Sequence, residues 1–261
     1  MRRTWNPAWV PRPEPEKMYA HVEDEGRRRL SRPPLQLAST SLVAGFDVVF
    51  GIVALAVVQH HHGHVAGSIA FGIAFVFIVV GKSELFTENF LVPLAALSRD
   101  DRGTWLKLAE LWTFSPIVNL IGGAILVLVV TSHGVLPEGT GETAVEIADK
   151  IDENGLLTAF LSAVAAGALV TLMTWMVEAM EEMGIRVLAA WIAGALLALG
   201  SFNHVIVVTL ELIFGWRYGG DYGWGDIAGN FGVAALGNLV GGVVFVTLTR
   251  TGQARSGSGS P

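Results

Sequence analysis

The chain repeats itself at one fixed offset. Asn119-Leu-Ile-Gly-Gly returns as Asn238-Leu-Val-Gly-Gly 119 positions later, and the same offset aligns Gly81 with Gly200. Each copy contains three long apolar segments. Because an odd number of crossings leaves the chain on the opposite side of a bilayer, the second copy must run upside down relative to the first. The pattern predicts an all-α membrane protein with six transmembrane helices in two inverted three-helix repeats.

Six segments are apolar on all sides and long enough to span about 30 Å of hydrocarbon, which takes roughly 20 helical residues. They cover 36–59, 66–97, 107–131, 156–180, 186–215 and 226–249. A soluble protein would show amphipathic helices instead. Inverted repeats of this kind are typical of transporters and channels, whose transport site lies near the midplane between the two halves.

These segments divide the chain into five parts. We expect a cytoplasmic N-terminal arm at 1–35, repeat one at 36–131, a periplasmic connector at 132–155, repeat two at 156–250 and a flexible cytoplasmic tail at 251–261. The arm is rich in proline, so we expect it to be mobile apart from one short amphipathic stretch at 14–32. The connector is expected to carry a short helix at 142–152.

The positive charges are distributed unevenly along the chain. Of 17 Lys and Arg residues, fourteen fall on one side of the predicted topology: Arg2, Arg3, Arg12, Lys17, Arg27, Arg28, Arg29, Arg32, Arg99, Arg102, Lys107, Arg186, Arg250 and Arg255. The positive-inside rule therefore places both termini in the cytoplasm of a bacterial inner membrane, with the acidic loop 138–153 outside. Beside a first transmembrane helix, a basic cluster is a topology signal or a contact for anionic lipid, so we expect a lipid bilayer and no nucleic acid as partner.

Several protein classes lack support in the sequence. The chain has no cysteine, and therefore no disulfide or thiol chemistry. It has no phosphate-binding loop, dinucleotide fingerprint or nucleophile elbow, so we expect neither an enzyme nor a cofactor. His60-His61-His62-Gly-His64 has a spacing that can bind zinc or nickel, but no acidic ligand is nearby. We expect no metal there; a protonatable outer rim is the alternative.

The second and fifth segments carry polar interruptions at the same repeat position. The first interruption contains Lys82, Glu84, Glu88 and Asn89 within eight residues of an apolar span. The other reads Ser201-Phe-Asn-His204, and Gly81 and Gly200 precede the two. Charge at such depth is retained only where it meets protein, water or a partner. We expect both helices to break at these glycines, with the amides of each following half-helix directed at the midplane, where they favour an anion.

Three motifs resemble one known family. Glu84-Leu-Phe-Thr-Glu-Asn is similar to the signature of the formate/nitrite transporter family, Ser201-Phe-Asn-His204 to its central-histidine motif and Gly237-Asn-Leu-Val-Gly-Gly to its last-helix motif. The resemblance covers about 36–250 and is strongest to the branch typified by the inner-membrane protein YfdC. It implies an aquaporin-like protomer, a homopentamer with one pore per protomer, and transport of small monovalent weak-acid anions such as formate or nitrite, often with a proton.

The resemblance also implies roles for individual residues. His204 matches the central pore histidine, and Thr87 matches the threonine of the loop that interrupts helix two. Four apolar residues match or have the spacing of the constrictions: Phe71 on the outer side, and Phe75, Leu85 and Phe86 on the cytoplasmic side.

The chain departs from the family pattern at several positions. Asn203 stands where an acidic residue usually precedes the histidine, and Val207 and Val208 stand where an asparagine often follows it. Gly167 occupies the expected position of a vestibule lysine, whereas Lys82 is an addition. These departures leave the identity of the substrate open.

Each polar residue has a structural alternative to its role in a pore. His204 can donate a hydrogen bond to an anion or relay a proton, or it can bond a neighbouring helix. Lys82 can attract an anion, or it can neutralise Glu84 in an internal ion pair that fastens the broken helix. Glu182 and Arg186, four residues apart, suggest a solvated pair.

The sequence thus predicts a channel for small monovalent weak-acid anions that is proton-linked through His204, with Thr87, Asn203, Lys82 and Glu84 as further pore or substrate residues. Two alternatives remain. The missing vestibule lysine favours a pore for a small neutral solute, and the long arm favours a non-transporting membrane scaffold of the same fold.

Overall fold

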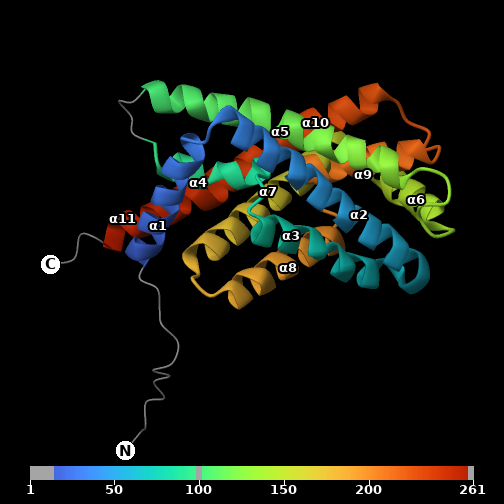
Figure 1. The fold of residues 1–261 in the computed structure, drawn as a ribbon, viewed down its shortest axis with the longest axis horizontal. Coiled ribbons are helices and arrows are strands. Elements are labelled where there is room, and N and C mark those ends of the chain that lie inside the picture. Colours follow the sequence, from blue (N-terminus) through green and yellow to red (C-terminus); the bar gives the residue numbers. More distant parts are fainter. Residues whose placement is uncertain (1–14, 98–101, 258–261) are drawn as a thin grey trace, which may run out of the picture.

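The computed structural model describes residues 15–97 and 102–257, and these residues form helices and no strands (Figure 1). The elements are α1 (Pro15–Leu30), α2 (Pro34–Phe71), α3 (Ile73–Gly81), the 3-10 helix η1 (Phe86–Phe90), α4 (Val92–Ala95), α5 (Arg102–Val130), α6 (Thr140–Asp152), α7 (Leu156–Ala179), α8 (Met183–Leu199), α9 (Val205–Arg217), α10 (Trp224–Leu239), the π-helix η2 (Val240–Thr247) and α11 (Leu248–Gly257). The start of the predicted arm at 1–14, Arg99 and the end of the tail at 258–261 lie outside the described residues.

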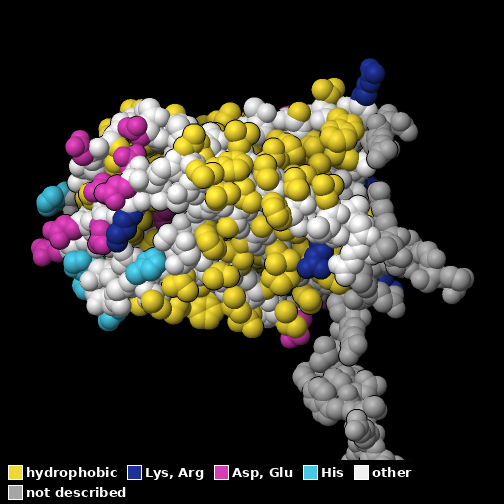
Figure 2. All heavy atoms as spheres, turned by 180° about the vertical axis from the view of Figure 1, so that it is seen from behind, with side chains coloured by type: hydrophobic (Ala, Val, Ile, Leu, Met, Phe, Trp, Pro, Cys, Tyr) yellow, Lys and Arg dark blue, Asp and Glu magenta, His cyan; other side chains and the backbone are white. Residues whose placement is uncertain are grey.

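Among the described residues, four helical stretches are long and apolar enough to cross a membrane. They are Pro34–Gly81, Arg102–Val130, Leu156–Ala179 and Trp224–Gln253. Large apolar side chains point outward from them, as in the stripe of Ile117, Ile121, Ile125 and Leu128 on α5. Figure 2 shows such side chains over the middle of one face, with acidic and histidine side chains gathered at one end. An apolar surface of this extent suits contact with hydrocarbon or another subunit.

The first of these stretches contains two passes of the chain. Gly63 interrupts α2 with φ 81° and ψ 172°, and α3 then packs back along α2. A residue with a Cβ rarely adopts this conformation, whereas glycine does so without steric penalty. The turn at Gly63 therefore separates the predicted first segment from the start of the second, within one continuous element.

Both predicted interruptions are present, and both have the same local geometry. Lys82 and Ser201 have φ angles of 53° and 47°, and they are the only non-glycine residues with positive φ in the described ranges. One backbone hydrogen bond closes each helix end. Ser83 N–H donates to the carbonyl of Ile78 at 3.0 Å, and Phe202 N–H donates to the carbonyl of Leu197 at 3.1 Å.

This hydrogen-bond pattern corrects the predicted position of the breaks. Gly81 and Gly200 were expected to leave helical geometry, but Gly200 keeps φ −81° and Gly81 is still the last residue of α3. A Schellman motif places its left-handed residue one position beyond the helix end, which here is Lys82 or Ser201. The chain therefore leaves the helix one residue later than predicted.

The two terminal helices lie together at the end of the molecule opposite α6 (Figure 1). α6 corresponds to the helix predicted at 142–152. α1 corresponds to the amphipathic stretch predicted at 14–32, but it is docked against α4, α7 and α11 rather than belonging to a mobile arm. The reason is a small apolar cluster in which Val22 of α1 packs with Leu91, Val92 and Trp175.

The C-terminal helix also extends further than predicted. α11 continues to Gly257, past the start of the tail expected at 251. The guanidinium of Arg250 lies 5.5 Å from the ring centre of Trp175, a geometry at which a cation is attracted to the ring face. This contact, together with the packing of α11 on α1, supports helical structure where the sequence alone suggested a free end.

Candidate functional site

Asn119 of α5 holds the first interruption in place. Its side-chain oxygen accepts from Phe86 N–H at 3.0 Å, and its amide nitrogen donates to the carbonyls of Ser41 at 2.7 Å and Glu84 at 2.9 Å. Asn119 is fully buried, so its bonds to Phe86 and Glu84 satisfy backbone groups that the break removes from the helix, and its bond to Ser41 ties them to α2.

Asn238 of α10 does the same for the second interruption. Its side-chain oxygen accepts from Val205 N–H at 2.9 Å, and its amide nitrogen donates to the carbonyls of Ala163 at 2.8 Å and Asn203 at 2.9 Å. The first backbone N–H of the helix that follows each break, that of Phe86 or Val205, therefore has an asparagine oxygen as its hydrogen-bond acceptor. The element after the first break is only the five-residue η1, which is shorter than the predicted half-helix.

Thr87 and His204 bring the two interruptions together. The imidazole Nε2 of His204 lies 2.7 Å from Oγ1 of Thr87, and both residues are fully buried. On the other side of the ring, Val207 N–H donates to Nδ1 at 3.3 Å. Because a backbone amide can only donate, Nδ1 is the acceptor and the ring proton is on Nε2. Nε2–H then donates to Thr87, whose own hydroxyl proton remains available to another acceptor.

Two aromatic rings lead away from this pair, beginning at His204. Phe75 meets the ring of His204 edge-on, with the ring centres 6.3 Å apart, and Phe71 follows at 6.2 Å from Phe75. Leu85 is fully buried in the core. The ring of Phe86 instead packs against Phe90, at 5.0 Å between ring centres. Phe75 is thus the predicted constriction residue that contacts the histidine. It lies between His204 and Phe71, which corrects its predicted place beside Leu85 and Phe86 on the cytoplasmic side.

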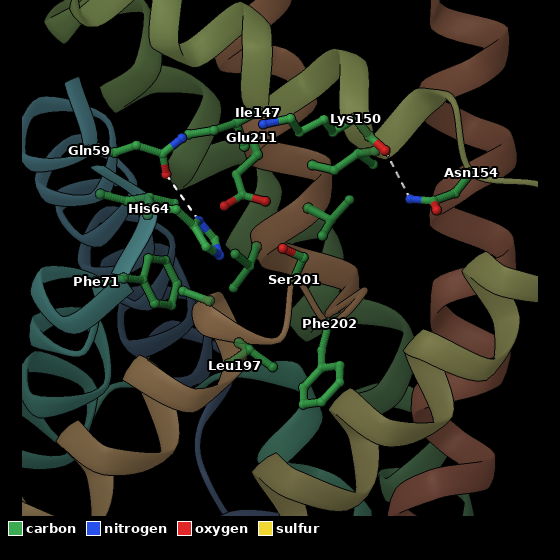
Figure 3. Close-up of a pocket in the computed structure, with 15 residues that line it drawn as sticks. Gln59, His64, Phe71, Ile147, Lys150, Asn154, Leu197, Ser201, Phe202 and Glu211 are labelled. Carbon is green, nitrogen blue, oxygen red and sulfur yellow. Dashed lines mark hydrogen bonds between the residues drawn. The ribbon is translucent and has the colours of Figure 1, made fainter. Parts of the chain in front are cut away.

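A cavity of about 250 Å³ lies beside Phe71 toward the end of the molecule formed by α6; it is called the outer cavity, after the predicted orientation of the chain. Phe71, Val207 and Phe202 line its apolar part, and α2, α6, α8 and α9 surround it (Figure 3). Glu211 also lines it, although the sequence analysis did not identify this residue. The available signal was a carboxylate within an apolar membrane segment, seven positions after His204.

A second cavity of about 420 Å³ lies on the side of α1. Basic and acidic side chains dominate its lining: Arg28, Arg29, Arg32, Lys82, Arg186, Glu25, Glu88 and Glu178. The two cavities lie toward opposite ends of the molecule, and neither lining includes Thr87 or His204. Phe71 of the first cavity contacts Phe75, which contacts His204, and Glu88 of the second cavity is the neighbour of Thr87.

Glu84 and Glu88 are paired with the arm, not with Lys82. Arg29 donates to both carboxylates at 3.3 Å, and Arg32 forms an ion pair with Glu84. Lys82 is exposed, so the proposed Lys82–Glu84 pair is not formed. Of the two alternatives for Lys82, the ion pair with Glu84 is therefore excluded, because α1 brings its arginines onto these carboxylates.

The network around Arg29 extends to α7 and α8. Glu178 accepts from Arg29 at 3.3 Å and from Arg186 at 3.2 Å. Arg186 was expected to form an ion pair with Glu182. In the structure it forms one with Glu178 instead. Burial lowers the pKa of Arg32 to about 10, with the nearby charges of Arg29 and Arg28 acting in the same direction. Its guanidinium therefore stays protonated at neutral pH.

Asn203, a predicted pore residue, is engaged between two helices. Its amide nitrogen donates to Asn230 of α10 at 2.9 Å and to the carbonyl of Ala159 of α7 at 3.3 Å, and Asn230 donates back at 3.3 Å. The sequence analysis missed Asn230 because nothing in the local pattern links positions 27 residues apart. Position 203 carries an amide where the family usually has an acidic residue. The two-way hydrogen bonding with Asn230 needs such an amide, because it both donates and accepts.

Comparison with known proteins agrees with this architecture. The chain is 30% identical over 187 residues to the uncharacterized transporter YrhG of Bacillus subtilis (strain 168), covering 70% of this chain and 68% of that one. Among solved structures, one described as an FNT family ion channel has a TM-score of 0.78 at 21% identity, covering 90% of this chain and 98% of the other. Another, a pentameric formate channel with formate bound, has a TM-score of 0.65 at 22% identity, covering 87% and 96%.

The two solved structures establish the channel fold of the chain. The family profile described as Formate/nitrite transporter matches residues 16–251, which include every element from α2 to η2. Members of this family are transporters and channels, not enzymes. From the extent of this match, the chain belongs to the formate/nitrite transporter family.

Proposed function

We propose that this protein is a channel for small monovalent weak-acid anions of the formate and nitrite type, with the passage running between Thr87 and His204. The observation that carries the proposal is the hydrogen bond between these residues, which joins the two interruptions, with one cavity toward each end of the molecule. The solved relative with bound formate supports the same class of substrate.

The apolar rings determine the form in which the substrate crosses. A bare anion cannot pass Phe71 and Phe75 cheaply, since burial of an unpaired charge costs far more than burial of a neutral acid. The substrate therefore acquires a proton before or within this constriction. Thr87 offers its hydroxyl proton as a hydrogen bond to the substrate while its oxygen accepts from His204. The neutral ring has only its Nε2 proton and its Nδ1 is occupied by Val207 N–H, so hydronium from the adjoining cavity supplies the proton that the anion takes up while the pair of Thr87 and His204 holds it.

Lys82 and Glu84 have different roles in this proposal. Lys82 is exposed at the inner cavity and attracts the anion electrostatically. Glu84 is fully buried against Arg29 and Arg32, and it anchors α1 beneath the first interruption rather than contacting substrate. Leu85 and Phe86 close the inner side of the passage, and Asn203 fixes the second interruption.

We propose six membrane crossings in two inverted three-helix repeats of an aquaporin-like protomer. The equivalent contacts of Asn119 and Asn238 support the repeat. The turn at Gly63 divides the first of the four membrane-length stretches into two crossings, and α8 with α9 forms the remaining one. The concentration of Lys and Arg at the end where α1 and α11 lie supports a bacterial inner membrane with both termini in the cytoplasm. The pentameric relative supports a homopentamer, and the form of the motif at Glu84 supports membership of the YfdC branch.

A pore for a neutral solute has one specific observation in its favour. A Cβ on Gly167 would overlap the backbone of Asn238, so the vestibule lysine expected at this position has no room. Without that charge, the outer cavity does not attract anions strongly. Uptake of the undissociated acid and of a neutral solute of similar size distinguishes the two functions.

The test is uptake of labelled formate by proteoliposomes at several pH values. We expect uptake well above that of protein-free vesicles, saturation with the concentration of the anion, and acidification of the lumen. His204→Ala is expected to lower the rate by at least about tenfold, or about 1.4 kcal/mol in the barrier, whereas His62→Ala at the exposed outer rim has no such effect. Equal rates in wild type and His204→Ala would contradict the proposal. Rates that follow only the undissociated acid, without dependence on Lys82, would favour the neutral-solute pore.

A further inference from the structure

Glu211 is a buried carboxylate that the passage described above does not use. It belongs to α9, has only 9% of its surface exposed, and lines the outer cavity. In Figure 3 its carboxylate points into the cavity between His64 and Ser201. No hydrogen bond or ion pair of this carboxylate exists within the described part of the chain. An ionisable side chain at this depth without a partner calls for a ligand or a proton.

The other charged and titratable groups facing the cavity have partners of their own. His64, which follows the turn in α2, contacts the side-chain oxygen of Gln59 and the carbonyl of Leu199, each at 3.3 Å. Lys150, from α6, pairs with Glu146 at 2.7 Å. The lining contributed by α8, Leu197 and Ala198, carries no charge. Glu211 therefore has no fixed counter-ion on any side of the cavity.

The protonation state of this carboxyl controls what the cavity can hold. An ionised Glu211 places a negative charge in the cavity that Phe71 also lines, and it repels a monovalent anion. A protonated Glu211 removes that charge and presents an O–H donor to an oxygen of the anion. Lys150, which also lines the cavity, forms an exposed ion pair with Glu146.

We propose that Glu211 is the specificity-determining residue of the outer cavity, which binds a monovalent oxyanion through its protonated carboxyl and excludes the anion when ionised. This inference rests on the proposed function, because it concerns the substrate of the same passage. It adds a second titrating group beside His204, on the outer side of the apolar rings. It also explains how the cavity accepts an anion without the vestibule lysine.

The first test measures the external formate concentration for half-maximal uptake, KM, in proteoliposomes with the lumen held at constant pH. We expect the KM of wild type to rise at least fivefold as the external pH increases from 5.5 to 8. In Glu211→Gln, which keeps a donor but cannot ionise, KM changes less than twofold. Glu153→Gln, a carboxylate of the same outer side that does not line the cavity, keeps the wild-type dependence. Leakage of undissociated acid is measured in protein-free vesicles and subtracted.

Two results separate this inference from the proposed function. Absence of formate uptake by wild type contradicts the proposed function, whereas uptake with the same pH dependence of KM in wild type and Glu211→Gln overturns the inference about Glu211. Glu211→Asp, which keeps an ionisable group, is expected to retain a pH-dependent KM and guards against a misfolded amide variant.

An infrared measurement tests the carboxyl independently of transport. Difference spectra of the pentamer with and without formate are expected to show a shifted carboxyl C=O band in wild type and in Glu153→Gln, and no such shift in Glu211→Gln. A spectrum in which formate moves no carboxyl band in wild type would overturn the inference, even if uptake is normal.

Discussion

The imidazole Nε2 of His204 lies 2.7 Å from the hydroxyl oxygen of Thr87, although the two residues are 117 positions apart and each follows a different break in the fold. Val207 N–H occupies the other ring nitrogen. This arrangement fixes the direction of the hydrogen bonds from backbone to imidazole to hydroxyl. It leaves one proton, that of Thr87, to be offered to a substrate.

Removal of the Thr87 hydroxyl is expected to lower the maximal rate of formate uptake. Thr87→Val keeps the shape of the side chain but leaves Nε2–H of His204 buried without an acceptor. We expect a loss of at least about 10²-fold, the lower end of what a positioned proton-transfer group contributes. Thr87→Ser keeps the hydroxyl and should retain most of the rate. Comparable rates for Val and Ser at this position would argue against a role of the hydroxyl in transport.

The asparagines beside the two breaks are expected to contribute mainly to stability. Asn119→Ala removes the partner of the amide of Phe86 and of the carbonyl of Glu84, at a cost of roughly 1–3 kcal/mol for each buried group. A clearly lowered Tm in detergent is the expected result, and Asn238→Ala should behave alike because its contacts are equivalent. Asn154→Ala, on the exposed connector, is the control. A Tm shift confined to one of the two variants would contradict their equivalence.

Arg29 is expected to be the most important residue of α1 for stability. Arg29→Met removes a buried guanidinium and leaves Glu84, Glu88 and Glu178 without it, a change that typically costs about 3–5 kcal/mol. Thermal unfolding and protease sensitivity of α1 provide the measurement. Arg27→Gln changes an exposed arginine of the same helix and should leave both unaffected. If the two variants have the same unfolding temperature and the same protease sensitivity, the buried ion pairs of Arg29 do not hold α1 in place.

Lys82 is expected to affect uptake from the inner side only. Lys82→Met removes an exposed positive charge at the inner cavity, so the KM for formate on that side should rise by roughly threefold, within the range of below about 1 kcal/mol for exposed charges. The effect should shrink at high salt, because the screening length falls from about 8 Å at 0.15 M to about 3 Å at 1 M. Lys107→Met, on α5, is the matched control. An equal change in KM on both sides of the membrane would contradict this placement.

Much of the fold follows from local and repeating features of the sequence. The apolar segments, the connector helix α6 and the two interruptions were all predicted, because hydrophobic length and polar residues at depth are strong signals in a membrane protein. The offset between Asn119 and Asn238 also predicted related positions for the two breaks. The meeting of Thr87 with His204 rested on the family motifs rather than on the residues alone.

The features that escaped prediction depend on contacts between distant positions. Arg29 of α1 pairs with Glu84 at the first break and with Glu178 of α7. No local sequence pattern indicates such distant partners. The pair formed by Asn203 and Asn230 has the same character. Glu211 differs, since a carboxylate within an apolar segment is visible in the sequence and its significance depends only on the cavity that it faces.

A double-mutant cycle between Thr87 and His204 tests the central claim most directly. Formate uptake is measured for Thr87→Val, His204→Ala and the double variant, together with wild type. If the two side chains act as one unit, the double variant should lose no more rate than the more impaired single variant, because the first substitution already disconnects the second residue. Losses that multiply, or a single variant with the rate of wild type, would contradict a passage that runs between these two residues.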